Sequence, residues 1–177
     1  MKRKATVTLG DRTWTGTFDA DQQLHGKGRI TERGQIVSTG MYDGGKLLHG
    51  WEVCECTDAK RAMLLSLRGT FVNGELTEGR QSFEVGSTQP FSQRLRLVTE
   101  GRFDPDGELH GQGVETISVV ERDGCLQCCQ TTSGRFEGGL IVCDADMTTT
   151  RGGMFPRMID RILDRRSVIW DLRACCR

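Results

Sequence analysis

Residues 101–113 read Gly-Arg-Phe-Asp-Pro-Asp-Gly-Glu-Leu-His-Gly-Gln-Gly, and this stretch decides the fold. An aromatic residue, Phe103, stands two positions after the first glycine, and a turn sequence follows it. Asp-Gly supplies the positive φ that tight hairpin turns require. Leu109 then opens a second extended segment. We therefore expect a β-hairpin whose first strand ends at the aromatic residue and whose second strand begins at the leucine.

The same arrangement recurs at four other places in the chain. A second glycine stands ten positions after the first in every copy except the last, where Asp144 replaces it. The copies begin at Gly16, Gly40, Gly69, Gly101 and Gly134. The leucines expected to open the return strands are Leu24, Leu48, Leu76, Leu109 and Leu140. Repeats of this kind predict an array in which each hairpin packs against the next.

Further hairpins are expected between the copies. Apolar and polar residues roughly alternate in residues 29–32 and 35–39, on either side of Arg33-Gly34, and this period is typical of half-buried strands. Residues 1–150 are therefore predicted to be all-β, as an elongated antiparallel meander of roughly ten strands.

Gly-x-Phe/Tyr, a turn and Leu-His-Gly-x-Gly together resemble the MORN repeat, the glycine and aromatic motif named membrane occupation and recognition nexus. The resemblance covers about residues 14–140. It implies an elongated, twisted array of MORN-like β-hairpin repeats with one aromatic residue per repeat along one face. It also implies scaffolding, cytoskeletal or flagellar assembly, dimerisation, or contact with phospholipid. The family repeat carries no catalytic residues.

The charge balance argues against a nucleic-acid partner. Lys and Arg number 24 and so do Asp and Glu, whereas nucleic-acid binders usually carry a basic surplus. The chain also lacks the common phosphate-loop, serine-hydrolase, dinucleotide and zinc-protease signatures, so neither enzymatic activity nor a cofactor is expected. A leader and an apolar stretch of about 20 residues are absent from the sequence, which predicts a cytoplasmic protein.

One aromatic residue per copy forms a column that is the first candidate for a partner-binding surface. A single-layer sheet needs cross-strand aromatic contacts to hold together, so packing alone is one interpretation of the column. Packing combined with contact to a partner is the other. The column consists of Phe18, Tyr42, Phe71, Phe103 and Phe136.

Histidines and cysteines raise the alternative of a zinc site or a small Cys/His enzyme. His25 and His49 occupy the same place in successive copies, two strands apart, so they should lie roughly 10 Å from each other. That separation is too great for two ligands of one metal ion. Cys54 and Cys56 would share one face of a strand and pack there. We therefore expect no metal.

The pattern changes to that of a helix over residues 154–174. Its apolar residues follow helical spacing, and residues 151–177 carry seven Arg against three Asp. This helix is expected to cap the sheet, to dock into a partner, or to lie on a membrane surface. Its candidate partner-binding residues are Phe155, Ile159, Ile162 and Trp170. Cys175 and Cys176 are candidate lipidation sites.

These patterns predict a non-enzymatic scaffold or protein-interaction module that positions a partner in a larger assembly, cytoskeletal or flagellar in type. Peripheral attachment to phospholipid through the basic C-terminal helix is the alternative function. Protein partners are expected, and homodimerisation is a further hypothesis. The expected location is the cytoplasm, in association with cytoskeleton or membrane.

Overall fold

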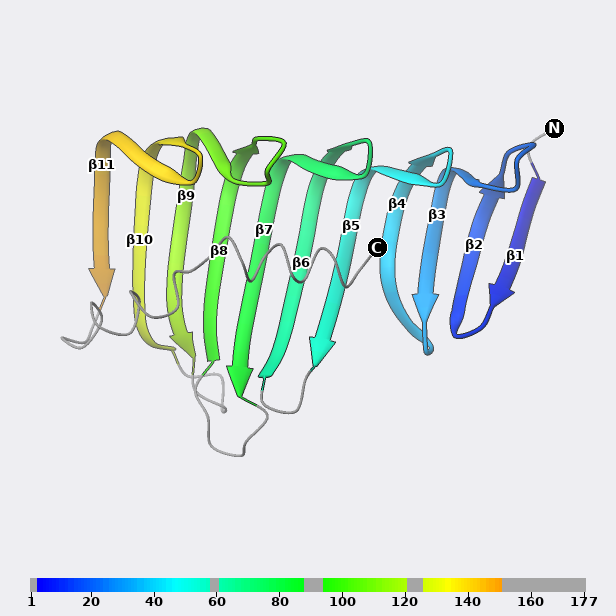
Figure 1. The fold of residues 1–177 in the computed structure, drawn as a ribbon, viewed down its shortest axis with the longest axis horizontal. Coiled ribbons are helices and arrows are strands. Elements are labelled where there is room, and N and C mark those ends of the chain that lie inside the picture. Colours follow the sequence, from blue (N-terminus) through cyan, green and yellow to red (C-terminus); the bar gives the residue numbers. More distant parts are fainter. Residues whose placement is uncertain (1–2, 58–60, 88–93, 121–125, 151–177) are drawn as a thin grey trace.

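The computed structural model of the protein describes residues 3–57, 61–87, 94–120 and 126–150. Every strand in these ranges belongs to one antiparallel sheet of eleven strands, arranged in the order of the sequence (Figure 1). The all-β class and the repeated hairpin arrangement are confirmed. The helix predicted for residues 154–174 lies outside the described residues, as do its candidate partner-binding residues and the two candidate lipidation sites.

The strands lengthen from the first hairpin towards the middle of the sheet. They are β1 (Arg3–Leu9), β2 (Arg12–Phe18), β3 (Leu24–Glu32), β4 (Gln35–Asp43), β5 (Lys46–Thr57), β6 (Arg61–Val72), β7 (Glu75–Ser87), β8 (Arg94–Phe103), β9 (Leu109–Val120), β10 (Leu126–Glu137) and β11 (Leu140–Thr150).

One glycine from each of the strands β2 to β10 lies in a single row across the sheet, which we call the glycine row. Its members are Gly16, Gly28, Gly40, Gly50, Gly69, Gly79, Gly101, Gly113 and Gly134. A Cβ atom on Gly69 would lie on the carbonyl oxygen of Glu78 and 2.8 Å from the Cα of Gly79. The φ of Gly69 is +152°, which side chains also disfavour. The facing strands can therefore approach this closely only where both residues are glycine.

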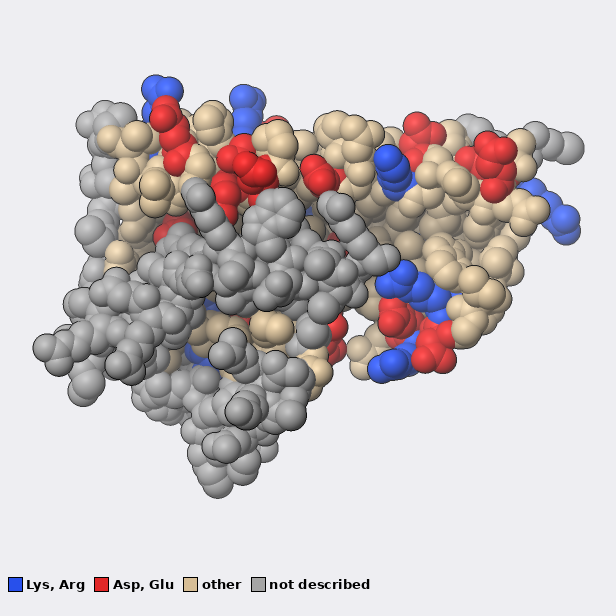
Figure 2. Space-filling view, viewed as in Figure 1, with Lys and Arg blue, Asp and Glu red and all other residues tan. Residues whose placement is uncertain are grey.

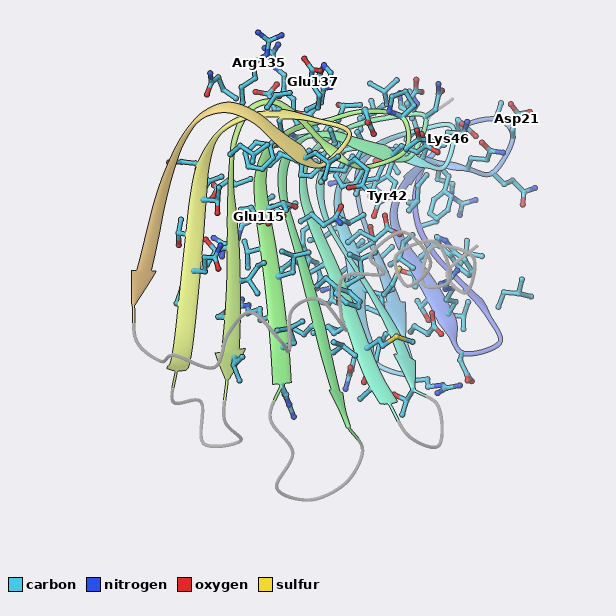
Figure 3. The ribbon with its side chains drawn as sticks, turned by 60° about the vertical axis from the view of Figure 1, so that its left-hand side comes forward. Asp21, Tyr42, Lys46, Glu115, Arg135 and Glu137 are labelled. Carbon is cyan, nitrogen blue, oxygen red and sulfur yellow. The ribbon has the colours of Figure 1, made fainter. Side chains whose placement is uncertain are left out.

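Beyond the glycine row the strands turn over, and the hairpin ends lie across one side of the sheet (Figure 3). We call the side of the sheet that the hairpin ends cover the inner face. Leu24 and Tyr42 fill the space that a side chain on Gly28 would need. Carbon atoms of these two side chains lie 3.1 and 3.2 Å from the position that a Cβ of residue 28 would take. The aromatic column and the leucines that face it thus form the core beneath the hairpin ends. The bend at the glycines is what buries them.

The leucine that faces the aromatic residue differs from the prediction in the second copy. Tyr42 pairs with Leu47, which is 4% exposed, whereas Leu48 is 41% exposed. The reason is the length of the turn. Asp43 pairs with Lys46 across a two-residue Gly-Gly turn, so the return strand begins earlier than the Leu-His-Gly motif indicates.

The first and fourth copies instead close with five-residue loops held by an aspartate. Asp19 Oδ1 accepts the backbone N–H of Gln23 at 2.9 Å, and Asp104 Oδ1 accepts that of Glu108 at the same distance. These longer loops shift the return strand by two residues. Gly16 consequently pairs with Gly28 and not with Gly26, although Gly26 stands at the repeated ten-residue spacing.

A row of mostly polar side chains lies next to the glycine row on the inner face. Residues two positions from a glycine face the same side of the sheet, so the row follows from the register. On the strands from β4 to β9 it contains Ser38, Glu52, Leu67, Gln81, Thr99 and Glu115. Except for Glu52, these side chains are no more than 9% exposed.

Candidate interaction surfaces

The outer face of the glycine row carries one candidate surface. Residues directly before and after each glycine point away from the inner face, because side chains alternate along a strand. A hollow of about 970 Å³ lies among these outward side chains, on the outside of β4 to β8. It is lined by Thr39, His49, Gly50, Trp51, Arg68, Gly69, Glu78, Gly79, Arg80, Glu100 and Gly101. We call it the outer groove.

Trp51 is the aromatic residue of the outer groove. It follows Gly50 on β5, and its indole N–H donates to the hydroxyl of Ser66 on β6 at 2.9 Å. This hydrogen bond satisfies the one polar atom of the indole and fixes the ring across the neighbouring strand. The half-buried ring presents an immobilised apolar surface within the groove.

Two arginines extend this surface beyond Trp51. Arg68 lies opposite Trp51 on β6, and Arg80 lies opposite Arg68 on β7. Like charges directly opposite each other on antiparallel strands are destabilising. Within the described residues neither arginine forms an ion pair, in contrast to Arg12 and Arg96, which pair with glutamates at 2.8 and 3.1 Å. Arg80 also lies opposite Glu100 of β8, and Glu78 lines the groove as well, so the groove carries two arginines and two glutamates that form no ion pair with one another.

A second charged surface lies along the edge where the hairpins close. Figure 2 shows acidic residues gathered along this edge, at the top of the view. Two of these acids have basic neighbours: Asp43 contacts the imidazole of His25 at 3.0 Å, and Glu137 contacts Arg135 at 3.4 Å (Figure 3 labels the second pair). Because exposed ion pairs of this kind contribute little free energy, they position the turn side chains more than they stabilise the sheet.

The aromatic column lies in the core. Phe18, Tyr42, Phe71, Phe103 and Phe136 are between 2% and 8% exposed. The hydroxyl of Tyr42, on the inner side of the curved sheet, hydrogen-bonds Ser38 at 2.6 Å (Figure 3). Burial is the main cause that raises the pKa of this phenol. The five rings therefore pack, and their direct contact with a partner stays a prediction.

The histidines do not occupy equivalent places, which corrects the expectation from the motif. His49 directly precedes Gly50 of the glycine row and lies 3.4 Å from the hydroxyl of Thr70. His25 precedes Gly28 by three residues, because the first loop is longer, and contacts Asp43. Where the chain is described, no three His, Cys, Asp or Glu side chains come together as a metal site. Cys54 pairs with Leu65 in the sheet.

Glu52 gives a pH-dependent prediction. Burial raises the pKa of its carboxyl above the usual value of 4.5, with nearby Arg12 opposing the rise. The folded state therefore binds this proton more tightly than the unfolded state, so the free energy of unfolding falls as the pH rises from 4.5 through the raised pKa. Glu52→Gln removes the titrating carboxyl, so this contribution to the fall in the free energy of unfolding is lost.

We expect the Glu52→Gln variant to gain stability relative to the wild type between pH 4 and pH 7, as measured by urea unfolding at both values. Glu55→Gln, at an exposed position of the same strand, is the matched control and should show no such gain. A Glu52→Gln difference that stays the same at both pH values would contradict the assignment.

No family model matches the chain, and no curated protein matches it. A search of the described residues for a helix that could cross a membrane found none.

The residues of the outer groove were missed by sequence reasoning. Trp51, Arg68 and Arg80 stand beside the repeated glycines, and the pattern drew attention to the aromatic residues and histidines instead. A usable signal was present: each of the three directly precedes or follows a glycine of the repeat. Once those glycines are known to face inwards, their neighbours must face outwards.

Proposed function

We propose that this protein is a divergent MORN-like repeat protein that acts as a non-enzymatic scaffold and binds a protein partner along its outer groove. The repeated hairpins, the glycine row and the buried aromatic column all support the repeat assignment. The rigid sheet supports a scaffolding role, because its ten antiparallel strand pairs fix the outer side chains relative to one another.

One observation carries the proposal: the hydrogen-bonded Trp51 stands beside two arginines that form no ion pair among the described residues. Trp and Arg are the residues most enriched where protein interfaces concentrate their binding energy. A surrounding rim of polar side chains, here Thr39, Glu78 and Glu100, is the usual setting for such residues. The expected partner presents an apolar side chain to Trp51 and carboxylates to the arginines.

Affinity purification of the tagged protein from its own cells tests this. Proteins recovered with the wild type are identified and quantified by mass spectrometry and compared with those recovered by Trp51→Ala and by the double variant Arg68→Glu/Arg80→Glu. We expect recovery of the specific partner to fall about tenfold or more in both variants, because loss of such an anchor typically costs about 2 kcal/mol or more.

The matched control is Lys4→Glu/Lys27→Glu. It makes the same charge change at two exposed positions of β1 and β3, on the same face but away from the lining of the outer groove, since Lys4 lies opposite Thr17 and Lys27 opposite Met41. Recovery should remain within about twofold of the wild type. Equal losses in the control and the groove variants would indicate non-specific charge effects, and unchanged recovery in all variants would refute a partner site in the outer groove.

A further inference from the structure

The inner face of the central strands carries an apolar surface beside the polar row, farther from the hairpin ends. Register places its side chains in two neighbouring rows across β5 to β9. The first row is Cys54, Leu65, Phe83, Leu97 and Ile117, and the second is Met63, Val85, Leu95 and Val119. We call these the apolar rows. In them Leu65 is 1% exposed, Phe83 6% and Val119 8%.

The described residues do not supply the layer that buries these side chains. They form a single sheet, and a single sheet leaves both faces open unless another layer packs on it. The hairpin ends fold over the glycine row, at the other end of the strands. On β1 the same face carries Val7 and Leu9, which are 46% and 75% exposed. Whatever covers the inner face therefore lies over the central strands and not over the first hairpin.

The chain leaves the sheet at the level of the apolar rows. β11 ends at Thr150, and Thr149 pairs with Gln130 of β10, which itself pairs with Ile117 of the first row. The 21 residues from 154 to 174 begin after an interval of three residues. As a helix they would be about 31 Å long, which equals about six strand spacings of about 4.8 Å. Measured from β11, that length reaches β5, where the apolar rows end.

The hydrophobicity and the charge of the C-terminal segment also match those of the inner face. The helical stripe of Phe155, Ile159 and Ile162 suits an apolar surface of this kind. Within the apolar rows and the polar row beside them, the charged side chains on β5 to β9 are two acids, Glu52 and Glu115. Residues 151–177 carry seven Arg and three Asp, so the segment and the face have opposite charge.

We propose that residues 154–174 dock as an amphipathic helix across the apolar rows of their own sheet. The segment then forms the second layer of the fold, which leaves the outer groove as the surface open to a partner. This inference does not depend on partner binding at the outer groove, since it concerns the opposite face.

Thiol labelling of Cys54 in the full-length protein tests the docking. Cys54 belongs to the first apolar row, and replacing Cys56 by serine in every protein compared leaves Cys54 as the one cysteine of its tryptic peptide, residues 47–60. Ile159→Ser/Ile162→Ser weakens the stripe and should raise the labelling rate about tenfold or more, because labelling follows the population of the undocked state. Asp160→Ser/Asp164→Ser, which makes the same replacement off the stripe, should leave the rate within about twofold.

A photocrosslinking amino acid placed at position 159 gives a second measurement that does not depend on how the serine variants fold. We expect crosslinks within one chain, to peptides from β6 to β9. Crosslinks only between two chains would show that a second copy covers the face and would overturn the proposal. It would be overturned equally by unchanged Cys54 labelling in Ile159→Ser/Ile162→Ser, or by crosslinks only to lipid when vesicles of anionic phospholipid are present.

Discussion

Gly69→Ala is expected to lower the free energy of unfolding by about 3 kcal/mol. The new methyl group would lie on the carbonyl oxygen of Glu78 and 2.8 Å from the Cα of Gly79. These are backbone atoms of the paired strand, so they cannot turn aside as a side chain can. The strands would have to separate where the sheet bends. Urea unfolding followed by circular dichroism measures the change.

Gly86→Ala is the control for this prediction. Gly86 lies on the same strand as Gly79 but outside the glycine row, and a Cβ there would meet only the flexible side chain of Arg94, at 3.0 Å. We expect an effect within about 0.5 kcal/mol. If the two alanine variants were equally stable, close approach of the strands at the glycine row would not be the reason for its glycines.

Phe71→Ala should cost about 3–5 kcal/mol of stability, because the side chain is large and well packed. Phe71 is 2% exposed, and it lies opposite Leu76, which is equally buried. Its removal would leave a cavity beneath the hairpin end, between neighbours on both sides of the column. The same urea unfolding experiment applies.

Two further variants separate burial from position in the sequence. Phe71→Leu keeps most of the apolar volume and should cost less than about 1.5 kcal/mol. Val72→Ala changes the next residue, which is 55% exposed, and should stay within about 0.5 kcal/mol. If Phe71→Ala and Val72→Ala had similar effects, the aromatic column would not be the core that holds the hairpins together.

The repeated hairpins could be predicted because each copy carries its own signal. This signal consists of an Asp-Gly or Asn-Gly turn, an aromatic residue before the turn, and alternation of apolar and polar residues in the flanking strands. Each of these patterns spans only a few residues. The first hairpin, β1 and β2, was not identified separately, because residues 3–12 carry neither the aromatic residue nor the leucine of the repeat.

The register of the glycines could not be read from their spacing. Both Gly26 and Gly50 stand ten residues after a repeat glycine, yet only Gly50 joins the glycine row. The difference depends on the length of each loop, which is set by hydrogen bonds such as that from Gln23 to Asp19. The outer groove depends on this register in turn. Its residues were therefore missed even though the fold class was correct.

Paired glycines align the hairpins and bend them over the core. Nuclear Overhauser effects between α-protons measure this directly, because such protons are close only in directly opposed residues of antiparallel strands. We predict cross-strand contacts for the four pairs within the repeats: Gly16 with Gly28, Gly40 with Gly50, Gly69 with Gly79, and Gly101 with Gly113. Contacts of Gly16 with Gly26 and of Gly101 with Gly111 in their place would contradict the account.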